Sequence, residues 1–391
     1  METTLTVEVT ILMPCLNEAE TLATCIRKAR QFLQTAGVTG EVLIADNGST
    51  DGSRAIAVNA GARVVVAEER GYGNALMRGI AAAQGTYIIM ADSDDSYDFT
   101  ALAPFLERLR AGDDLVMGNR FRGGIKPGAM PPLNRTLGNP LLSWMGRLFF
   151  GSRCGDFYCG LRGIRKAVVE KMDLRTTGME FAIEMVVKAT LLGLRVSEVP
   201  TILSPDGRSH PPHLRPWRDG WRTVRFFLIY SPRWLFLYPG ILLMFVGLLV
   251  GVWLLPRPRV LGNVTVDVQT LLYAAMAALI GFQAVSFAAF TKVFSISEGL
   301  LPEPPRLIRV FRMMSLEVGL AIGGILIVGG LFGSFRAVSE WAVRSFGPLN
   351  TSETLRLVIP AITLLVLGCQ VVLSSFFISI LWLRRNRSGR A

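Results

Sequence analysis

The chain has 391 residues, a formal net charge of +11 and a hydrophobic content of 51%, which is high for a water-soluble protein. Its five cysteines are odd in number and scattered, which fits reduced thiols in a cytosolic domain better than a disulfide framework. No known nucleic-acid-binding module accompanies the basic residues, and we therefore expect no nucleic acid as a partner.

Short β-branched runs alternate with helical patterns from residue 7 to about residue 200. Strands are expected at residues 7–13, 41–45, 63–67, 86–91 and 114–118, and helices at residues 20–33, 53–60, 74–83 and 100–110. Such alternation predicts an α/β domain with a mostly parallel sheet that is covered by helices. Ligands of such domains bind beyond the carboxyl ends of the strands.

The C-terminal part of the chain is much more apolar. Four segments are long and uncharged enough to cross a bilayer, at residues 234–255, 268–290, 318–335 and 357–383. No basic n-region of a signal peptide opens the chain, so we expect the N-terminal part to stay in the cytoplasm and four spans to return the C-terminus there. Lys and Arg are also more frequent in the link after the second span and in the tail than in the two outer loops.

A basic and aromatic segment lies between these two parts. Arginines at a spacing of three to four residues, among them Arg218 and Arg222, alternate with tryptophans. Next to a membrane span this pattern predicts an interfacial helix in contact with lipid phosphates, and a solvated basic helix is the alternative. We therefore expect three regions: an enzyme-like domain at 1–210, an interfacial helix at 211–233 and a four-helix membrane domain at 234–391.

Polar residues follow the first and second expected strands. The first strand runs into M-P-C-L-N-E, where Asn17 and Glu18 could hydrogen-bond a ribose or a base edge, or Asn17 could cap the next helix. The second strand ends at Asp46, whose carboxylate could accept an N–H from uracil or guanine, and turn formation explains the remainder of that segment. The chain has no P-loop motif, and a dinucleotide fingerprint is absent after the first strand.

The fourth expected strand ends in the acidic segment A-D-S-D-D-S-Y-D. In an extended chain Asp92 and Asp94 point the same way, so the two carboxylates could hold Mg²⁺ or Mn²⁺ while a diphosphate completes the coordination. A calcium loop is excluded, because Tyr97 stands where glycine is needed and Ala103 where the bidentate glutamate belongs. Asp98 is expected to cap the following helix.

Taken in chain order, P-x-x-N-E, Asp46 and D-S-D resemble the family-two glycosyltransferases with a GT-A fold, over roughly residues 7–210. Two further segments strengthen this resemblance. M-G-N-R-F-R-G-G is similar to the Gly-Ser-Arg-Tyr/Phe segment of dolichyl-phosphate mannose synthases and bacterial polyprenyl-phosphate glycosyltransferases. D-F-Y-C-G-L-R is similar to their Asp-x-x-x-Gly-Phe-Arg/Lys segment.

The resemblance implies roles for individual residues. Nucleotide-sugar binding falls to Pro14, Leu16, Glu18, Asp46, Asp92, Ser93, Asp94, Arg208 and His210. The implied metal-binding positions are Asp92, Asp94 and Ser96, the last at a place where some relatives have a metal-binding glutamine. The implied catalytic positions are Asp94, Arg120, Asp156 and Arg162, with Arg120 on phosphate and the last two on the acceptor side. Because His210 replaces the family's lysine, either His210 or Arg208 would supply the basic contact.

The resemblance also implies an activity: inverting transfer of a hexose from a UDP-glucose or GDP-mannose type donor to undecaprenyl or dolichyl phosphate, with Mg²⁺ or Mn²⁺. The enzyme would be a multi-pass protein of the cell (inner) membrane with a cytoplasmic active site. One alternative is a processive polysaccharide synthase, although the chain has S-P-R-W where those enzymes have Gln-x-x-Arg-Trp. Another is a membrane transport or scaffold protein that only binds a nucleotide sugar. The sugar, the nucleotide and the oligomeric state stay open, a homo-oligomer included.

Overall fold

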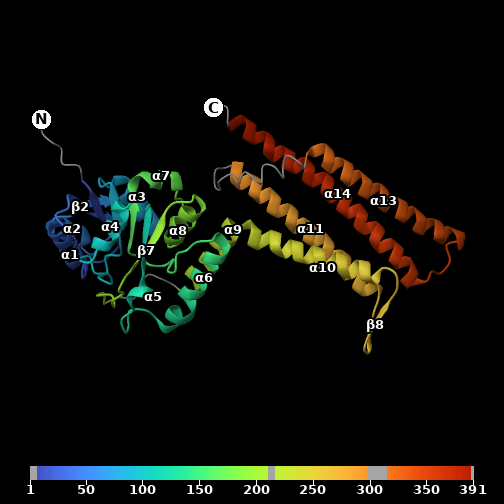
Figure 1. Cartoon of the computed structure of the whole chain (residues 1–391), viewed down its shortest axis with the longest axis horizontal. Helices are drawn as coiled ribbons and strands as arrows, with labels where there is room; N and C mark the ends of the chain where they lie inside the picture. The colour runs from blue at the N-terminus through green and yellow to red at the C-terminus, as the bar shows by residue number, and fades with distance from the viewer. Residues whose placement is uncertain (1–6, 210–215, 298–314, 389–391) are drawn as a thin grey trace. The chain divides into compact units, whose positions relative to one another are not determined.

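The computed structural model describes residues 7–209, 216–297 and 315–388 of the chain. The chain divides into two compact units, Met1–Phe227 and Leu228–Ala391 (Figure 1).

The first unit is built on a seven-stranded sheet. Its strands are β1 (Val9–Cys15), β2 (Gly40–Asp46), β3 (Arg63–Val66), β4 (Tyr87–Met90), β5 (Leu115–Asn119), β6 (Arg162–Arg165) and β7 (Val196–Pro200). Their order across the sheet is β3-β2-β1-β4-β6-β5-β7, and neighbouring strands run parallel except where β6 pairs with β4 and β5. The mostly parallel sheet predicted from the alternating pattern is therefore confirmed.

Helices connect these strands and cover the sheet (Figure 1). They are α1 (Leu22–Thr35), α2 (Ser53–Asn59), α3 (Tyr72–Ala82), α4 (Ala103–Arg110), α5 (Arg120–Gly123), the π-helical turn η1 (Asn134–Gly138), α6 (Asn139–Phe150), α7 (Lys166–Met172), α8 (Phe181–Leu191) and α9 (Pro216–Tyr230). Helix α1 shows why they pack as they do. It buries Leu22, Ile26, Ala29 and Leu33, which recur every three or four residues and so form one apolar face.

Strand β1 lies inside the sheet, between β2 and β4, and all of its residues are buried. A parallel strand covered on both faces needs a nearly continuous apolar run, and V-T-I-L-M-P-C is apolar except for Thr10. Helix α3 approaches this strand closely, since a Cβ at Gly79 would lie only 2.3 Å from Leu12 Cδ1. The carboxyl end of β1 is thus held in a rigid layer, and the residues that follow it have fixed starting positions.

Strand β6 was not predicted from the sequence, because R-G-I-R is too short to show alternation. It inserts antiparallel between β4 and β5, and its residue Arg162 pairs with Met90 on one side and with Met117 on the other. The D-F-Y-C-G-L-R segment therefore ends beside the carboxyl end of β4. This insertion brings it next to the D-S-D segment.

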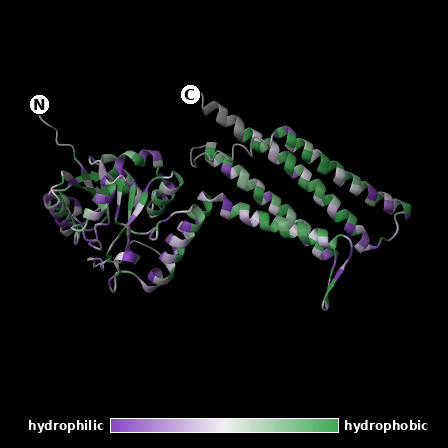
Figure 2. Ribbon diagram, in the orientation of Figure 1, coloured by the Kyte–Doolittle hydropathy of each residue, from purple (hydrophilic) through white to green (hydrophobic). Residues whose placement is uncertain are grey.

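The second unit consists mainly of long apolar helices, drawn in green in Figure 2. Its elements are the π-helical turn η2 (Arg233–Leu237), α10 (Tyr238–Leu254), β8 (Arg259–Leu261), β9 (Val264–Val266), α11 (Val268–Ser297), α13 (Leu316–Val343) and α14 (Thr351–Ser388). Four helical segments are long and apolar enough to cross a membrane: Arg233–Leu254, Val268–Ile296, Leu316–Val343 and Thr351–Leu381. Each contains most of one predicted span.

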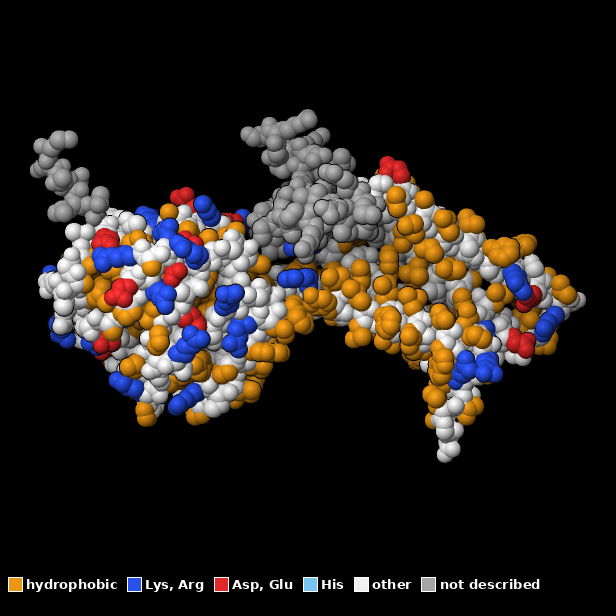
Figure 3. Space-filling view, viewed as in Figure 1, with side chains coloured by type: hydrophobic (Ala, Val, Ile, Leu, Met, Phe, Trp, Pro, Cys, Tyr) orange, Lys and Arg blue, Asp and Glu red, His pale blue; other side chains and the backbone are white. Residues whose placement is uncertain are grey.

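Small residues let these helices approach one another closely. A Cβ at Gly247 of α10 would lie 2.5 Å from the carbonyl oxygen of Ala274 in α11, and a Cβ at Gly281 would lie 2.4 Å from the backbone nitrogen of Met244. Helices in lipid gain little from the hydrophobic effect and associate largely through such close packing. Their outer faces remain apolar, as the hydrophobic side chains on this unit in Figure 3 show.

Candidate functional site

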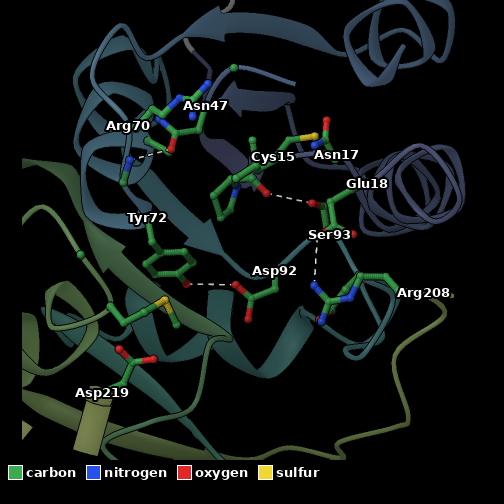
Figure 4. A pocket seen from close by; sticks show the side chains of 18 of the residues that line it. Cys15, Asn17, Glu18, Asn47, Arg70, Tyr72, Asp92, Ser93, Arg208 and Asp219 are labelled. Carbon is green, nitrogen blue, oxygen red and sulfur yellow. Dashed lines mark hydrogen bonds and ion pairs between the residues drawn. The ribbon is translucent and has the colours of Figure 1, made fainter. Parts of the chain in front are cut away.

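A pocket of about 650 Å³ opens in the first unit, where the residues that follow β1, β2 and β4 converge (Figure 4). Its lining consists of Pro14, Cys15, Leu16, Asn17, Glu18, Asn47, Gly48, Thr50, Arg70, Gly71, Tyr72, Ala75, Asp92, Ser93, Asp94, Gly178, Met179, Arg208, Arg218, Asp219 and Arg222. The carboxyl ends of adjacent parallel strands meet at one edge of a sheet, which explains why segments distant in sequence meet here.

Hydrogen bonds tie the end of β1 to the neighbouring loops. Ser93 Oγ donates to the Pro14 carbonyl oxygen at 2.8 Å, and the Thr50 backbone N–H donates to Asn17 Oδ1 at 2.8 Å. Asn17 has φ 59°, a left-handed conformation that asparagine tolerates better than most residues. Helix α1 begins at Leu22, so Asn17 is part of this turn and not a helix cap.

Asp46 differs from its expected role. The structure keeps its carboxylate out of the pocket lining, because Oδ2 accepts from Arg54 Nε at 2.6 Å and both oxygens accept from the backbone N–H groups of the following turn. Burial opposes ionisation of this group, but the bonds from Ser49 and Arg54 outweigh it and lower the pKa of Asp46. Asn47 and Gly48, the next two residues, line the pocket instead.

Asp92 lies in the pocket with Tyr72 and Arg208 on either side in Figure 4. The Tyr72 hydroxyl donates to Asp92 Oδ1 at 3.0 Å. Burial, and then the negative charge of Asp94, raise the pKa of Asp92 to about 6. Arg162 acts in the opposite direction, since its buried positive charge lowers that pKa. A buried carboxylate such as Asp92, whose ionisation is opposed by a neighbouring negative charge, is a favourable place for a cation.

Asp94 lines the pocket beside Asp92 and is fixed by its own loop. Its Oδ1 accepts from the Ser96 hydroxyl at 2.6 Å and from the Ser96 backbone N–H at 3.1 Å. Ser96 is not among the lining residues and is bonded to Asp94, and its implied place as a metal ligand stays a prediction. The adjacent Asp95 is turned away and forms an ion pair with Lys28 at 2.7 Å.

Asp98 shapes a turn and does not cap the helix directly. Its Oδ1 accepts from the Thr100 backbone N–H at 3.0 Å and from the Thr100 hydroxyl at 2.7 Å, whereas helix α4 begins only at Ala103. The expectation that Asp98 caps the helix is therefore wrong, because the predicted helix start at residue 100 was too early.

Arg208 enters the pocket from the loop after β7. Its guanidinium donates to Glu18 Oε1 at 3.0 Å, to Asp94 Oδ2 at 2.9 Å and to Asp206 Oδ2 at 2.8 Å. The side chain is 11% exposed. The Gly207 N–H also donates to the Asp94 carbonyl oxygen at 2.9 Å, so this loop is fastened to the acidic segment. His210, the other candidate for the basic position, lies outside the described residues.

Arg120 and Asp156 form a buried pair outside the pocket lining. Arg120 Nε donates to Asp156 Oδ2 at 2.7 Å, and Arg120 Nη2 donates to Asp156 Oδ1 at 2.8 Å. Arg120 is 7% exposed and Asp156 0%. The guanidinium fork is occupied by the Asp156 carboxylate in a two-point arrangement, and the implied contact of Arg120 with phosphate stays a prediction.

Arg162 is likewise buried and absent from the lining. It donates to the Ala182 carbonyl oxygen at 2.7 Å and to the Cys159 carbonyl oxygen. Its positive charge acts on the pocket through Asp92, and its implied place on the acceptor side stays a prediction.

Tyr72 is a pocket residue that the sequence analysis missed. The G-Y-G segment around it has a packing reason: a Cβ at Gly73 would lie 2.2 Å from the Thr176 carbonyl oxygen, and one at Gly71, which has φ 142°, would lie 2.3 Å from the Thr177 carbonyl oxygen. Because neither glycine has a side chain, this segment can pass close to the backbone of Thr176 and Thr177, and Tyr72 between them points toward Asp92. The paired glycines were the only local signal of this close approach.

Arginines line another part of the same pocket. Arg70 precedes α3, and Arg218 and Arg222 lie one turn apart near the start of α9. Arg222 faces Glu180 and Asp219 at 3.6 and 3.9 Å, which is longer than a hydrogen bond. Arg218 and Arg222 were predicted to meet lipid phosphates on an interfacial helix, and the structure places both in the pocket wall.

No group of three or more His, Cys, Asp or Glu side chains within residues 7–209, 216–297 and 315–388 is arranged to hold a metal ion. Two carboxylates are nevertheless sufficient for Mg²⁺, which commonly keeps waters and takes the remaining ligands from substrate phosphates. Asp92 and Asp94 supply such hard oxygen donors in the pocket. The donor set therefore fits a divalent cation that arrives with a diphosphate.

Comparison with known proteins gives matches in both units. The model of the glycosyl transferase family 2 matches residues 10–173, and that of the glycosyltransferase family 2 C-terminal transmembrane region matches residues 289–382. The low-salt glycan biosynthesis hexosyltransferase Agl6 of Haloferax volcanii is 35% identical over 372 residues, which cover 94% of this chain and 87% of that protein.

Two further matches are weaker. The dolichyl-phosphate hexose transferase of Haloferax volcanii is 31% identical over 161 residues, 41% of this chain and 68% of that protein. A crystal structure of glucosyl-3-phosphoglycerate synthase from Mycobacterium tuberculosis, in complex with Mn²⁺, UDP and glucosyl-3-phosphoglycerate, matches with a TM-score of 0.44 and 22% identity. That match covers 57% of this chain and 77% of the other.

Proposed function

The chain belongs to glycosyltransferase family 2, and from this membership we propose that it transfers a hexose from a nucleoside diphosphate sugar to the phosphate of a polyprenyl lipid. The protein is a membrane-bound glycosyltransferase. In our proposal residues 1–210 form the catalytic domain on the cytoplasmic side, residues 211–233 contain an interfacial helix, and residues 234–391 anchor the enzyme. The observation that carries this proposal is a pocket with carboxylates on one part of its wall and arginines on another.

The donor is proposed to bind at the carboxyl ends of β1, β2 and β4. Pro14, Leu16 and Asn47 offer contacts to the nucleoside, and Asp92 and Asp94 lie where a cation and a diphosphate can be held together. A nucleobase that needs a carboxylate partner would not find one at Asp46, because that carboxylate already accepts hydrogen bonds from the Gly48 backbone N–H and from Arg54. Hydrogen bonding to the base is therefore assigned to the backbone and to Asn47.

Mg²⁺ or Mn²⁺ is proposed to bind to Asp92 and Asp94. When bound, the ion would neutralise the charge of the departing nucleoside diphosphate. Arg208 is the cation that the chain itself supplies at this place, 2.9 Å from Asp94 Oδ2. We propose that it turns from the carboxylates to the diphosphate once the donor is bound, where it would stabilise the developing negative charge.

The acceptor is proposed to bind near Arg218 and Arg222. Helix α9 carries both arginines and ends at Tyr230, shortly before the first apolar segment starts at Arg233. At 1.5 Å per residue, Arg222 is about 12 Å along the helix from Tyr230, so its charge is close to the start of a membrane span. A lipid phosphate is an anion held at such a place, and the name of the dolichyl-phosphate hexose transferase relative points to the same class of acceptor.

Direct displacement at the anomeric carbon, with inversion, needs an ionised nucleophile. A phosphate monoester supplies this by itself, because its second pKa of about 6 leaves it ionised at neutral pH. The pocket then has to hold two anions, the donor diphosphate and the acceptor phosphate, in line with the sugar. Arg208 would serve the first, and Arg218 with Arg222 would serve the second.

A transfer assay on membranes that contain the full chain tests this proposal. The membranes are incubated with radiolabelled UDP-glucose, GDP-mannose or UDP-N-acetylglucosamine, Mg²⁺ or Mn²⁺, and undecaprenyl or dolichyl phosphate, and lipids are then extracted with organic solvent. We expect label in a short glycolipid with one of these donors. Membranes that carry the Asp94→Asn variant are the matched control and should yield none.

Two results would contradict the proposal and support other functions. Label in an insoluble polymer would indicate a processive polysaccharide synthase. Nucleotide-sugar binding without transfer to any acceptor would indicate a protein that carries or presents the sugar.

A further inference from the structure

The first unit carries an exposed apolar face on a helix that the functional proposal does not use. Residues 132–150 are helical throughout, as η1 and α6 with one preceding turn. We call five large side chains on this segment the apolar stripe. They are Leu133, Leu137, Leu141, Trp144 and Leu148, and they are 52, 55, 45, 50 and 43% exposed.

The spacing of the stripe, four, four, three and four residues, places its side chains on one face of the helix. The opposite face holds the helix to the unit, because Phe149 and Phe150 are buried and a Cβ at Gly146 would lie 2.7 Å from the Phe157 ring. A surface helix in water presents polar residues outward. An outward apolar stripe of this length therefore needs an apolar environment.

The charge around the stripe indicates what that environment is. No Asp or Glu lies between Asp114 and Asp156. Arg135, Arg147 and Arg153, which fall within or just after the helical segment, are all exposed. Large apolar side chains with exposed arginines and no acids are typical of helices that lie in the interfacial layer of an anionic bilayer.

Helix α6 is also packed against the helix that leads to the membrane. The Phe227 ring of α9 lies 5.6 Å from the Phe150 ring and 6.3 Å from the Phe149 ring, measured between centroids. The chain from Phe227 to Arg233, where the first apolar segment begins, reaches at most about 20 Å even when fully extended. The end of α6 is therefore within a short chain length of a membrane span.

Helix α9 presents a similar outer face. Trp217 and Trp221 are 84 and 64% exposed, and Ile229 is 58% exposed. Trp217 and Trp221 are four residues apart and Ile229 follows eight residues later, so the three side chains lie near one helical face. Helices α6 and α9 are thus two amphipathic helices that contact each other through Phe227. Hydrophobic side chains are visible in Figure 3 over the part of the first unit where Figure 1 draws α6.

We propose that the apolar stripe is a membrane-docking surface: it inserts into the interfacial layer of the bilayer, and Arg135, Arg147 and Arg153 bind anionic lipid headgroups. The four spans anchor the chain, whereas this surface fixes how the first unit lies on the membrane. The consequence for the pocket follows through α9, which carries Arg222 in the pocket wall and Phe227 against α6. Docking of α6 thus sets the depth of the pocket relative to lipid phosphates.

The docking surface can be tested without any transfer assay, so the test does not depend on the proposed function. The full chain carries Cys369→Ser, which removes the exposed native thiol, while the other four cysteines are buried. Leu141→Cys is labelled with an environment-sensitive fluorophore, and Val58→Cys is the matched control, because Val58 is an apolar residue of α2 that is 61% exposed. Both proteins are reconstituted in vesicles of phosphatidylcholine with phosphatidylglycerol.

We expect the label at residue 141 to emit at shorter wavelength than the label at residue 58, and to be quenched by lipids that carry a quencher on the upper acyl chain. Iodide in the aqueous phase should quench only the control. Raising the phosphatidylglycerol fraction should strengthen lipid quenching at residue 141, and Arg147→Glu with Arg153→Glu should remove that dependence.

Two outcomes would overturn the proposal. Equal quenching of both labels by iodide, with none by the lipid-borne quencher, would mean that the stripe faces water. A label at residue 141 that is shielded from iodide and from the lipid-borne quencher, and whose emission depends on protein concentration in detergent, would mean that the stripe binds a second copy of the chain.

Discussion

The Arg208 guanidinium is bonded to Asp94, one of the two carboxylates that we propose to hold a divalent cation, and to Glu18. It is 2.9 Å from Asp94 Oδ2 and 3.0 Å from Glu18 Oε1. A cation that binds to Asp94 must therefore displace this positive charge. We expect Arg208→Gln to bind Mn²⁺ more tightly than the unmodified protein in the absence of nucleotide, and at the same time to transfer sugar more slowly.

The size of the first effect follows from the distances. Two unit charges at 4 Å interact by about 1 kcal/mol in bulk water and by about 4 kcal/mol near a protein surface. The Arg208 side chain can move away from Asp94 when the metal binds. The electrostatic free energy by which it opposes binding should therefore lie in the lower part of this range. About 1.4 kcal/mol corresponds to a tenfold lower Kd for Mn²⁺.

The second effect has the opposite sign, because the glutamine cannot neutralise the departing diphosphate. Removing one donor to a developing oxyanion typically lowers kcat by about 100-fold to 1,000-fold, and a loss at the lower end of this range is expected for Arg208→Gln. Tighter metal binding combined with slower transfer is a signature that general damage to the fold would not produce.

Free Mn²⁺ is counted by electron paramagnetic resonance during titration of the purified full chain without nucleotide. Arg208→Lys keeps the positive charge and is the matched control, with a Kd near that of the unmodified protein. An unchanged or higher Kd for Arg208→Gln would refute the reasoning, since Arg208 would then not compete with the metal. A Kd for Arg208→Lys as low as that for Arg208→Gln would refute the electrostatic cause.

Three further predictions concern the same unit. Asp94→Asn should abolish transfer while the protein stays in carbonate-washed membranes, and retained transfer would remove the metal from the mechanism. Asp156→Asn leaves the buried Arg120 charge without its partner, so the free energy of unfolding, measured by thermal denaturation, should fall by about 3–5 kcal/mol. An unchanged midpoint of thermal unfolding together with lost transfer would instead support a direct role of the pair in the reaction. Tyr72→Phe removes a bond that lowers the pKa of Asp92, which is about 6. Protonation of Asp92 opposes metal binding, so Mn²⁺ binding to the unmodified protein should weaken as the pH falls through about 6. In the Tyr72→Phe variant the same weakening should occur at a higher pH. Mn²⁺ titrations at several pH values would show the difference.

The sequence by itself determined the elements whose signal is local. Apolar runs of membrane-spanning length, and the switch from strand to helix spacing, depend only on neighbouring residues, because burial on one face imposes a fixed period. The D-S-D segment could also be placed at the carboxyl end of a strand, since Tyr87–Met90 is a short apolar run that ends directly before it. That position was enough to predict that Asp92 and Asp94 would share a site with the residues after β1.

The tertiary structure alone decided which partner each charged residue has. Arg208 lies 114 positions from Asp94 and 190 from Glu18 along the chain, and no local pattern encodes such a contact. The same holds for Arg120, which the resemblance placed on a phosphate and which the fold pairs with Asp156 in the interior. A guanidinium pairs most strongly with a carboxylate that it can contact at two points. Asp156 reaches Arg120 because β6, which follows Asp156, inserts between β4 and β5.

The apolar stripe on α6 shows the same division. Its spacing is present in the sequence, but periodic leucines indicate a buried face as readily as an exposed one. Only the packing of Gly146, Phe149 and Phe150 onto the unit determines that Leu137 and Leu141 point outward. Periodicity therefore fixes which residues share a face, and the tertiary contacts of the opposite face decide whether that face meets protein, water or lipid.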